Sequence, residues 1–303
     1  MARDWEEAFA GWTRRASNAE QTRYENTKAA IEEALRAQGI LSKYTFDVYA
    51  KGSYPNFTNV VRDSDVDVAA ELTSFAQNKF IFDAADLTIE DIGKTPYTGG
   101  LSLSQFKNDV ERALGEYFGS TAVKRGDKSI HVRESKQALK ADVVPCVTHL
   151  TWTSRTSRRP GIRLQSDSAP TQPILNYPAQ HHDRGVEKND RCSRRYKRVV
   201  RILKNLENEI VSKGVIEVVP SFLIESAVWN VPDPNLTTPA TWTGRTRNAL
   251  AHIFNGTMSR DCIGSDDWLE ANGIKYLFHS TQNWTYTQLH TFASRAWDYV
   301  GFE

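Results

Sequence analysis

Two short stretches of this 303-residue chain combine residue types suited to phosphate and metal chemistry. Gly52 lets the backbone approach a phosphate closely, and the hydroxyl and N–H groups at Ser53 can bond phosphate oxygens. Asp65 and Asp67 follow. A strand running on from Asp65 would project these two side chains from one face. The pattern therefore predicts a phosphate loop leading into a carboxylate metal site, with a solvated turn and strand edge as the alternative.

Paired carboxylates need a cation nearby. Two of them about 4 Å apart repel by about 4 kcal/mol at an effective dielectric of about 20. Oxygen donors suit Mg²⁺, with Mn²⁺ as a possible substitute, and Mg²⁺ is normally completed by substrate phosphates. We expect Asp65 and Asp67 to hold the metal of a nucleotide.

Asp142 is the third carboxylate, because it interrupts an apolar, strand-like run. In a two-metal site it would join Asp65 and Asp67 on a second ion that lowers the pKa of an attacking hydroxyl. The reaction would be in-line displacement at an α-phosphate, with pyrophosphate as the leaving group. The alternative is that Asp142 forms an ion pair with Lys140 or Lys128.

These residues need a mixed α/β framework to bring them together. Gly39, Gly52 and the Lys94–Gly100 segment interrupt the periodic stretches. The strands should form a meander beside the Asp65 strand, followed by a hairpin over 148–168 and a helical C-terminal part. We expect a catalytic domain over 1–178 and a helical domain over 179–303. The remaining elements are helices within 5–38 and over 102–119, and strands over 43–50, 122–125, 129–133 and 139–147.

A second pattern lies between Asp190 and Ser212, where a helix is expected with one basic and one apolar face. Lysine binds triphosphates as a compact charge, so this helix could close over a nucleotide cleft. The alternative is a solvated basic face. The basic positions are Arg194, Lys197, Arg201 and Lys204.

Composition limits the class of protein. A net charge of +1 speaks against a protein that coats nucleic acid, and we expect no stable nucleic-acid partner. Cys146, Cys192 and Cys262 lack metal-ligand spacing, and their odd number does not suggest a disulfide framework. No apolar run reaches about 18 residues and the N-terminus is charged, so we expect a soluble, cytoplasmic protein without membrane contact.

Taken in order, these motifs resemble those of the cGAS/DncV-like nucleotidyltransferases (CD-NTases) of bacterial anti-phage defence. The resemblance covers most of the chain and is greatest to the clade E enzymes and the bacterial pyrimidine (uridylate and cytidylate) cyclases. It implies a polymerase-β-like nucleotidyltransferase core with a mixed sheet, a C-terminal helical domain and a cleft between them. The segments that carry it are 52–59, 64–68, 141–144, 175–178, 202–205, 220–225 and 229–233.

The resemblance also assigns roles to residues. It implies that Lys204 and Ser221 contact the β- and γ-phosphates, and that Asn176 selects a pyrimidine. A carboxamide can match the O4 and N3–H edge of uracil, so UTP is the expected substrate and CTP is the second candidate. Asn176 is alternatively an ordinary turn residue. Tyr54 and Tyr177 either stack on the base or belong to the core.

The expected activity is therefore a magnesium-dependent nucleotide cyclase that makes a defence signal for a separate effector protein. Lys51, Pro55 and Phe57 depart from the family pattern and favour a narrow acceptor pocket, hence 3′,5′-cyclic UMP from UTP. A pyrimidine-containing cyclic dinucleotide (c-di-UMP or cyclic UMP-AMP) is the nearest alternative. An RNA-extending nucleotidyltransferase and a non-catalytic nucleotide sensor are two further ones.

Overall fold

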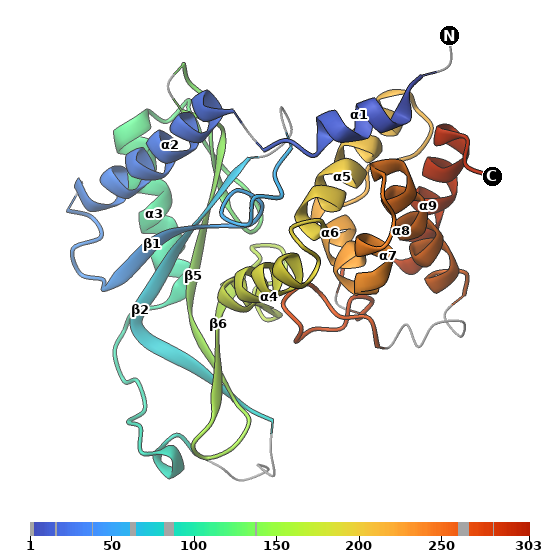
Figure 1. Cartoon of the computed structure of the whole chain (residues 1–303). Helices are drawn as coiled ribbons and strands as arrows, with labels where there is room; N and C mark the ends of the chain where they lie inside the picture. The colour runs from blue at the N-terminus through green and yellow to red at the C-terminus, as the bar shows by residue number, and fades with distance from the viewer. Residues whose placement is uncertain are drawn as a thin grey trace. The chain divides into compact units, whose positions relative to one another are not determined.

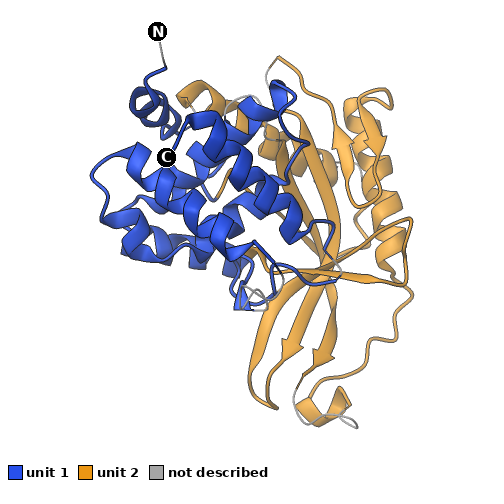
Figure 2. Cartoon of the chain, turned by 90° about the vertical axis from the view of Figure 1, so that its right-hand side faces the viewer, with its two compact units in different colours: residues 1–16, 56–63, 179–303 blue, residues 17–55, 64–178 orange. Residues whose placement is uncertain are grey.

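The computed structural model describes residues 3–15, 17–37, 39–60, 65–81, 88–136, 138–259, 267–280 and 282–303. Ser64 and Cys262 lie outside these ranges. The chain forms two compact units, coloured separately in Figure 2. Residues 17–55 and 64–178 make up the sheet unit, and residues 1–16, 56–63 and 179–303 make up the helical unit. The chain thus passes from the sheet unit to the helical unit between Pro55 and Asn56, directly after the Gly52-Ser53 loop.

The sheet unit contains a seven-stranded mixed sheet with the path β1-β2-β5-β4-β3, and β6 joins β5 to β7. β2 and β5 are parallel, whereas the other neighbouring pairs are antiparallel. This arrangement confirms the expected mixed sheet and the 148–168 hairpin. The strands are β1 (Phe46–Lys51), β2 (Val66–Phe80), β3 (Val123–Arg125), β4 (Ile130–Val132), β5 (Ala141–Trp152), β6 (Arg158–Gln165) and β7 (Pro173–Asn176).

Alternation along β2 separates the two faces of the sheet. Val66, Val68, Ala70 and Leu72 are buried in a core shared with α2 (Asn18–Ala37) and α3 (Leu103–Phe118), which lie together against the sheet in Figure 1. Since successive strand side chains point to opposite faces, Asp67 leaves β2 on the face away from these helices. Ser102 caps the N-terminus of α3, because its side chain accepts a hydrogen bond from the Gln105 N–H.

The helical unit is built around a separate apolar core that includes Phe9, Leu203, Leu223 and Phe292. None of the helices in the described ranges is long and apolar enough to cross a membrane. The expected helix-rich C-terminal part is confirmed. Its helices are α1 (Trp5–Trp12), α4 (Pro178–Arg191), α5 (Tyr196–Ser212), α6 (Ser221–Asn230), α7 (Asp233–Thr237), α8 (Trp242–Gly256) and α9 (Tyr286–Val300).

Two expectations for this region are wrong. The helix predicted from Asp190 is interrupted, because Ser193 and Arg194 have φ values of 49° and 63° and separate α4 from α5. The alternative of a solvated basic face is also wrong for the three basic positions within α5. Lys197, Arg201 and Lys204 are 7%, 3% and 2% exposed. Charge periodicity could not show this, since their partners come from other segments.

Candidate functional site

The Gly52-Ser53 loop begins where β1 ends, and its geometry requires glycine. Gly52 has φ +76°, and a Cβ atom there would overlap an oxygen of the Asp67 carboxylate and lie 3.3 Å from its Cγ. Ser53 is half-buried, and its hydroxyl has no hydrogen-bond partner among the described residues. The loop therefore brings bare backbone to a carboxylate and leaves a hydroxyl available for a ligand.

The parallel pairing of β2 and β5 brings two of the predicted metal ligands together. Asp67 and Asp142 are register partners, so their side chains leave neighbouring strands on the same face. Asp65 lies just before β2 and thus two residues from Asp67. The side chains of Asp65, Asp67 and Asp142 are 37%, 37% and 24% exposed, so all three carboxylates are accessible to solvent.

Each of these carboxylates faces a nitrogen-bearing side chain. Lys51 Nζ lies 3.5 Å from Asp67 Oδ1, and Lys140 Nζ lies 2.6 Å from Asp65 Oδ2. The hydrogen bond to Asp65 raises the pKa of Lys140. Asp142 accepts a hydrogen bond from His131 Nδ1 on β4, rather than pairing with Lys140 or Lys128.

Sequence reasoning missed His131. The available signal was its position between Ile130 and Val132, which places it on the polar face of a short strand.

The donor chemistry of the three aspartates fits a hard divalent cation, because carboxylate oxygens are ligands that Mg²⁺ prefers. As the side chains stand, however, no three His, Cys, Asp or Glu side chains within the described ranges are grouped closely enough to hold a metal. The carboxylates are instead directed at Lys51, Lys140 and His131. Metal binding would require them to exchange these partners for the ion.

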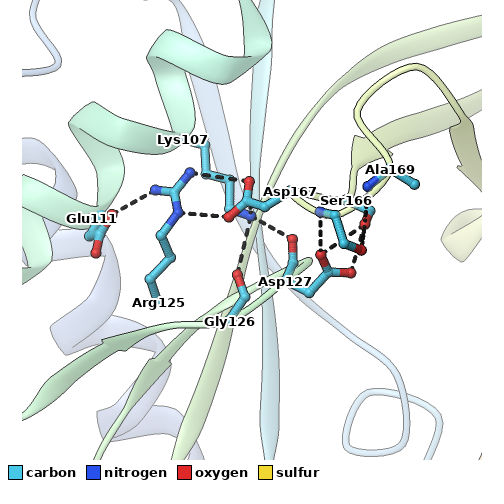
Figure 3. Close-up of polar contacts among 9 residues, drawn as sticks. Lys107, Glu111, Arg125, Gly126, Asp127, Ser166, Asp167 and Ala169 are labelled. Carbon is cyan, nitrogen blue, oxygen red and sulfur yellow. Dashed lines mark hydrogen bonds and ion pairs between the residues drawn. The ribbon is translucent and has the colours of Figure 1, made fainter.

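A polar network secures the β3–β4 hairpin that carries His131 (Figure 3). Lys107 of α3 donates hydrogen bonds to the carbonyls of Gly126 and Asp127, at 3.3 and 2.7 Å, and pairs with Asp167 at 2.9 Å. Arg125 bridges Glu111 and Asp167. The Asp127 carboxylate accepts hydrogen bonds from the Ser168 N–H and from Ser166 Oγ, which lower its pKa to about 2. The network ties α3, the hairpin turn and the β6–β7 loop together.

Asn176 ends β7, where its backbone is the register partner of Ile162. Its side chain is half-buried, and the carboxamide makes no hydrogen bond within the described part of the chain. A carboxamide without internal partners has both its donor and its acceptor available, as recognition of a base edge requires.

Both tyrosines that were considered for base stacking belong to the core of the sheet unit. Tyr54 is 5% exposed and stacks on Tyr24, with ring centroids 4.9 Å apart. Tyr177 is 6% exposed, and its hydroxyl lies 3.0 Å from Thr151 Oγ1. These contacts support the core alternative for both residues.

Lys204 lies inside the helical unit and is held by a buried carboxylate. Its Nζ donates hydrogen bonds to Glu225 Oε2 at 3.0 Å and to the Thr58 carbonyl at 3.2 Å. Glu225 also accepts from Thr58 Oγ1 and from His181 Nε2, at 2.7 and 2.8 Å. Burial disfavours ionisation of Glu225, but the charges of Lys204 and His181 outweigh it and hold its pKa well below the ordinary value.

Ser221 is the first residue of α6 and is exposed. Its hydroxyl has no hydrogen-bond partner among the residues described. The N–H groups of Leu223 and Ile224 donate to the Pro220 carbonyl. The N–H groups of Ser221 and Phe222, at the start of the helix, are the donors that this end of α6 can offer to an anion. The helical unit thus presents Ser221 openly, whereas Lys204 is engaged with Glu225.

The fold is that of a nucleotidyltransferase, as comparisons with known proteins show. Residues 183–301 match the family model for the cGAS/DncV-like nucleotidyltransferase C-terminal helical domain. The chain is 34% identical over 308 residues to a cyclic dipyrimidine nucleotide synthase, CdnE, of Cecembia lonarensis, covering 100% of both chains. The chain therefore belongs to the cGAS/DncV-like nucleotidyltransferase (CD-NTase) family.

Two solved structures share the fold over nearly the whole chain. One is the CdnE cyclic dinucleotide synthase of Elizabethkingia meningoseptica with GTP and Apcpp. It has a TM-score of 0.80 and 28% identity, with 99% of this chain and 100% of the other covered. The other is the CdnE c-UMP-AMP synthase of Rhodothermus marinus with Apcpp and Upnpp. It has a TM-score of 0.80 and 26% identity, with 99% and 98% covered.

Proposed function

We propose that this protein is a magnesium-dependent cyclic nucleotide synthase that uses UTP and releases pyrophosphate. The observation that carries the proposal is the register pairing of Asp67 with Asp142. Gly52 lies beside Asp67, at a position that has no room for a Cβ atom. This arrangement puts carboxylates next to a backbone loop suited to phosphates. Family membership supports the same reaction type.

In this proposal Asp65, Asp67 and Asp142 hold the metal, and Gly52 and Ser53 bind the triphosphate. The bound Mg²⁺ would supply charge neutralisation for the phosphates and activation of the attacking hydroxyl. The 3′ oxygen forms a bond to the α-phosphorus as the bond to the pyrophosphate oxygen breaks. Asp142 assists removal of the hydroxyl proton.

Within the helical unit, we assign the β- and γ-phosphates to Ser221 and Lys204. The Ser221 hydroxyl has no hydrogen-bond partner in the described part of the chain. Lys204 must leave Glu225, or share it, to reach a phosphate oxygen. Of the two, Ser221 therefore needs the smaller rearrangement.

The preference for UTP rests on Asn176 and on the relatives. Asn176 lies at a strand end, and its carboxamide has no hydrogen-bond partner among the described residues. The Cecembia lonarensis protein is named a dipyrimidine synthase, and the Rhodothermus marinus protein a c-UMP-AMP synthase. CTP is the second substrate to test, because a cytosine presents its amino group where uracil presents O4.

For the product, we favour a pyrimidine-containing cyclic dinucleotide, with c-di-UMP first and cyclic UMP-AMP next. The named relatives make rings of two nucleotides, and one of them covers this chain end to end. Cyclic UMP, expected from the sequence, is the second candidate. Lys51 favours it, because its side chain occupies space beside Asp67. A smaller acceptor space would favour attack by the nucleotide's own 3′ hydroxyl.

We further propose that the product is a second messenger of anti-phage defence that acts on a separate effector protein in the cytoplasm.

Two rival activities are to be distinguished from this one. RNA extension is the nearer rival activity and needs a primer. A non-catalytic sensor is the other rival, and the presence of Asp65, Asp67 and Asp142 speaks against it.

The test incubates purified protein with Mg²⁺ and each ribonucleoside triphosphate, singly and mixed, without primer, and identifies the products by mass spectrometry. A cyclic dinucleotide containing uridylate would support the main proposal, and cyclic UMP from UTP alone the second candidate. Linear products that appear only with added RNA would establish the primer-extending rival. Nucleotide binding without pyrophosphate release would establish the sensor.

A further inference from the structure

The register of the sheet places the two paired aspartates inside a row of basic side chains. Across β1, β2, β5, β4 and β3, the successive register partners are Lys51, Asp67, Asp142, His131 and Lys124. Register partners project from the same face of a sheet. Asp67 therefore has Lys51 on one side and Asp142 on the other.

Lys51 is held beside Asp67 with little access to water. Its side chain is only 15% exposed, and the 3.5 Å separation of Nζ from Asp67 Oδ1 is an ion pair. Among the described residues, Asp67 is its one charged partner. The Asp67 carboxylate is 37% exposed, so solvent screens the pair from one side only, while the ammonium is largely shielded.

A divalent cation at Asp67 would meet this ammonium at short range. Both positive charges would share one carboxylate, and their repulsion would subtract from the attraction of the ion to Asp67. A nucleotide changes this balance, since its phosphates add negative charge beside Gly52 and Ser53.

Building on the proposed function, we propose that Lys51 is a positioning residue that competes with the divalent metal for Asp67. It keeps metal affinity low until a triphosphate is present. Metal binding and nucleotide binding are thereby coupled through one lysine, and the metal is retained mainly when substrate is in place.

The test measures Mn²⁺ binding to the nucleotide-free protein by calorimetry, with Mn²⁺ as a probe of the magnesium site. Lys51→Gln should bind Mn²⁺ about 5-fold more tightly than the wild type, because one competing charge is removed. Lys51→Arg keeps the charge and should bind Mn²⁺ no more tightly than the wild type. Lys124→Gln removes the same charge at the far end of the row and should change affinity by less than about 2-fold. Lys51→Met serves as a second uncharged variant.

The gain in Mn²⁺ affinity that Lys51→Gln brings must depend on Asp67. In an Asp67→Asn background, Lys51→Gln should bring no increase in Mn²⁺ affinity. Unchanged affinity in both folded uncharged variants would overturn the proposal, and so would an equal gain in Lys124→Gln. With a non-hydrolysable UTP analogue bound, the difference between wild type and Lys51→Gln should shrink to less than about 2-fold, and an undiminished gain would contradict the coupling.

These measurements stand apart from the proposed activity. If the protein makes no cyclic nucleotide but Lys51→Gln still gains Mn²⁺ affinity through Asp67, the proposed function fails and the role of Lys51 stands. If cyclic nucleotide forms but Lys51→Gln binds Mn²⁺ no more tightly than the wild type, the proposed function stands and the role of Lys51 fails.

Discussion

Asp67 on β2 and Asp142 on β5 are register partners in the parallel pair of the sheet. Their carboxylates therefore leave neighbouring strands on one face, although they lie far apart in the sequence. His131 is the register partner of Asp142 on its other side and donates a hydrogen bond to it. The sheet thus holds both carboxylates by backbone pairing, before any metal or nucleotide arrives.

Gly52→Ala should damage the carboxylate site specifically. An alanine at φ +76° is strained by about 1 kcal/mol, and its Cβ would also overlap the Asp67 carboxylate. Gly39→Ala is the matched control, because Gly39 has φ +62° with nothing within 4 Å of a Cβ. Both variants should lose similar stability in urea unfolding, but only Gly52→Ala should lose pyrophosphate release. Equal activities would argue against close approach of the loop to Asp67.

Asn176→Ala should weaken selection of the base. Loss of hydrogen bonds to the uracil edge is expected to raise KM for UTP about 10-fold or more, with a smaller change for ATP. Steady-state kinetics with each triphosphate measure this, and the ATP series controls for general damage to the fold. A uniform change for all four nucleotides would show that Asn176 is a turn residue.

Lys204→Met separates a structural role from phosphate binding. Glu225 would be left buried with one cation fewer, which typically lowers the free energy of unfolding by about 3 kcal/mol or more. Lys213→Met, at the exposed end of α5, should change it by less than about 0.5 kcal/mol. Urea unfolding provides the measurement. Unaltered stability combined with a raised KM for UTP would instead assign Lys204 to the phosphates alone.

His149 should make the sheet unit less stable in mild acid. It is 4% exposed on β5, and burial, with the charges of Arg163 and Lys79, lowers its pKa to about 4 from 6.5. The unfolded chain therefore binds more protons between these pH values. Its contribution to stability is full above pH 6.5 and falls as pH decreases towards 4, by on the order of 3 kcal/mol.

The pH dependence can be assigned by substitution. His149→Gln should remove that part of the decline in urea unfolding measured at several pH values between 4 and 7.5. A decline of the same size in His149→Gln would place its origin in other groups.

Much of the sheet unit could be predicted from the sequence, because local signals agree there. The Gly52-Ser53 loop, the alternation after Asp65 and the apolar run around Asp142 each point to the observed element. The hydrogen bond of His131 to Asp142 and the ion pair of Lys51 with Asp67 could not be predicted, since they depend on the register of strands that are distant in sequence.

The helical unit was harder to predict for a related reason. Helical periodicity identified α5, but it could not show that Lys204 is buried against Glu225, which comes from another helix. The break before α5 depends on two residues with positive φ, Ser193 and Arg194, neither of which is glycine. Such conformations are uncommon for these residue types and carry no clear sequence signal.

The most direct test of the central claim is pyrophosphate release from UTP and Mg²⁺ by Asp67→Asn and Asp142→Asn, with Asp47→Asn as the control. Asp47 is exposed on β1 and lies outside the carboxylate site. We predict that each of the first two variants loses about 100-fold or more of the wild-type rate while remaining folded, and that Asp47→Asn keeps it. Wild-type rates in Asp67→Asn or Asp142→Asn would contradict the assignment of this pair to the reaction.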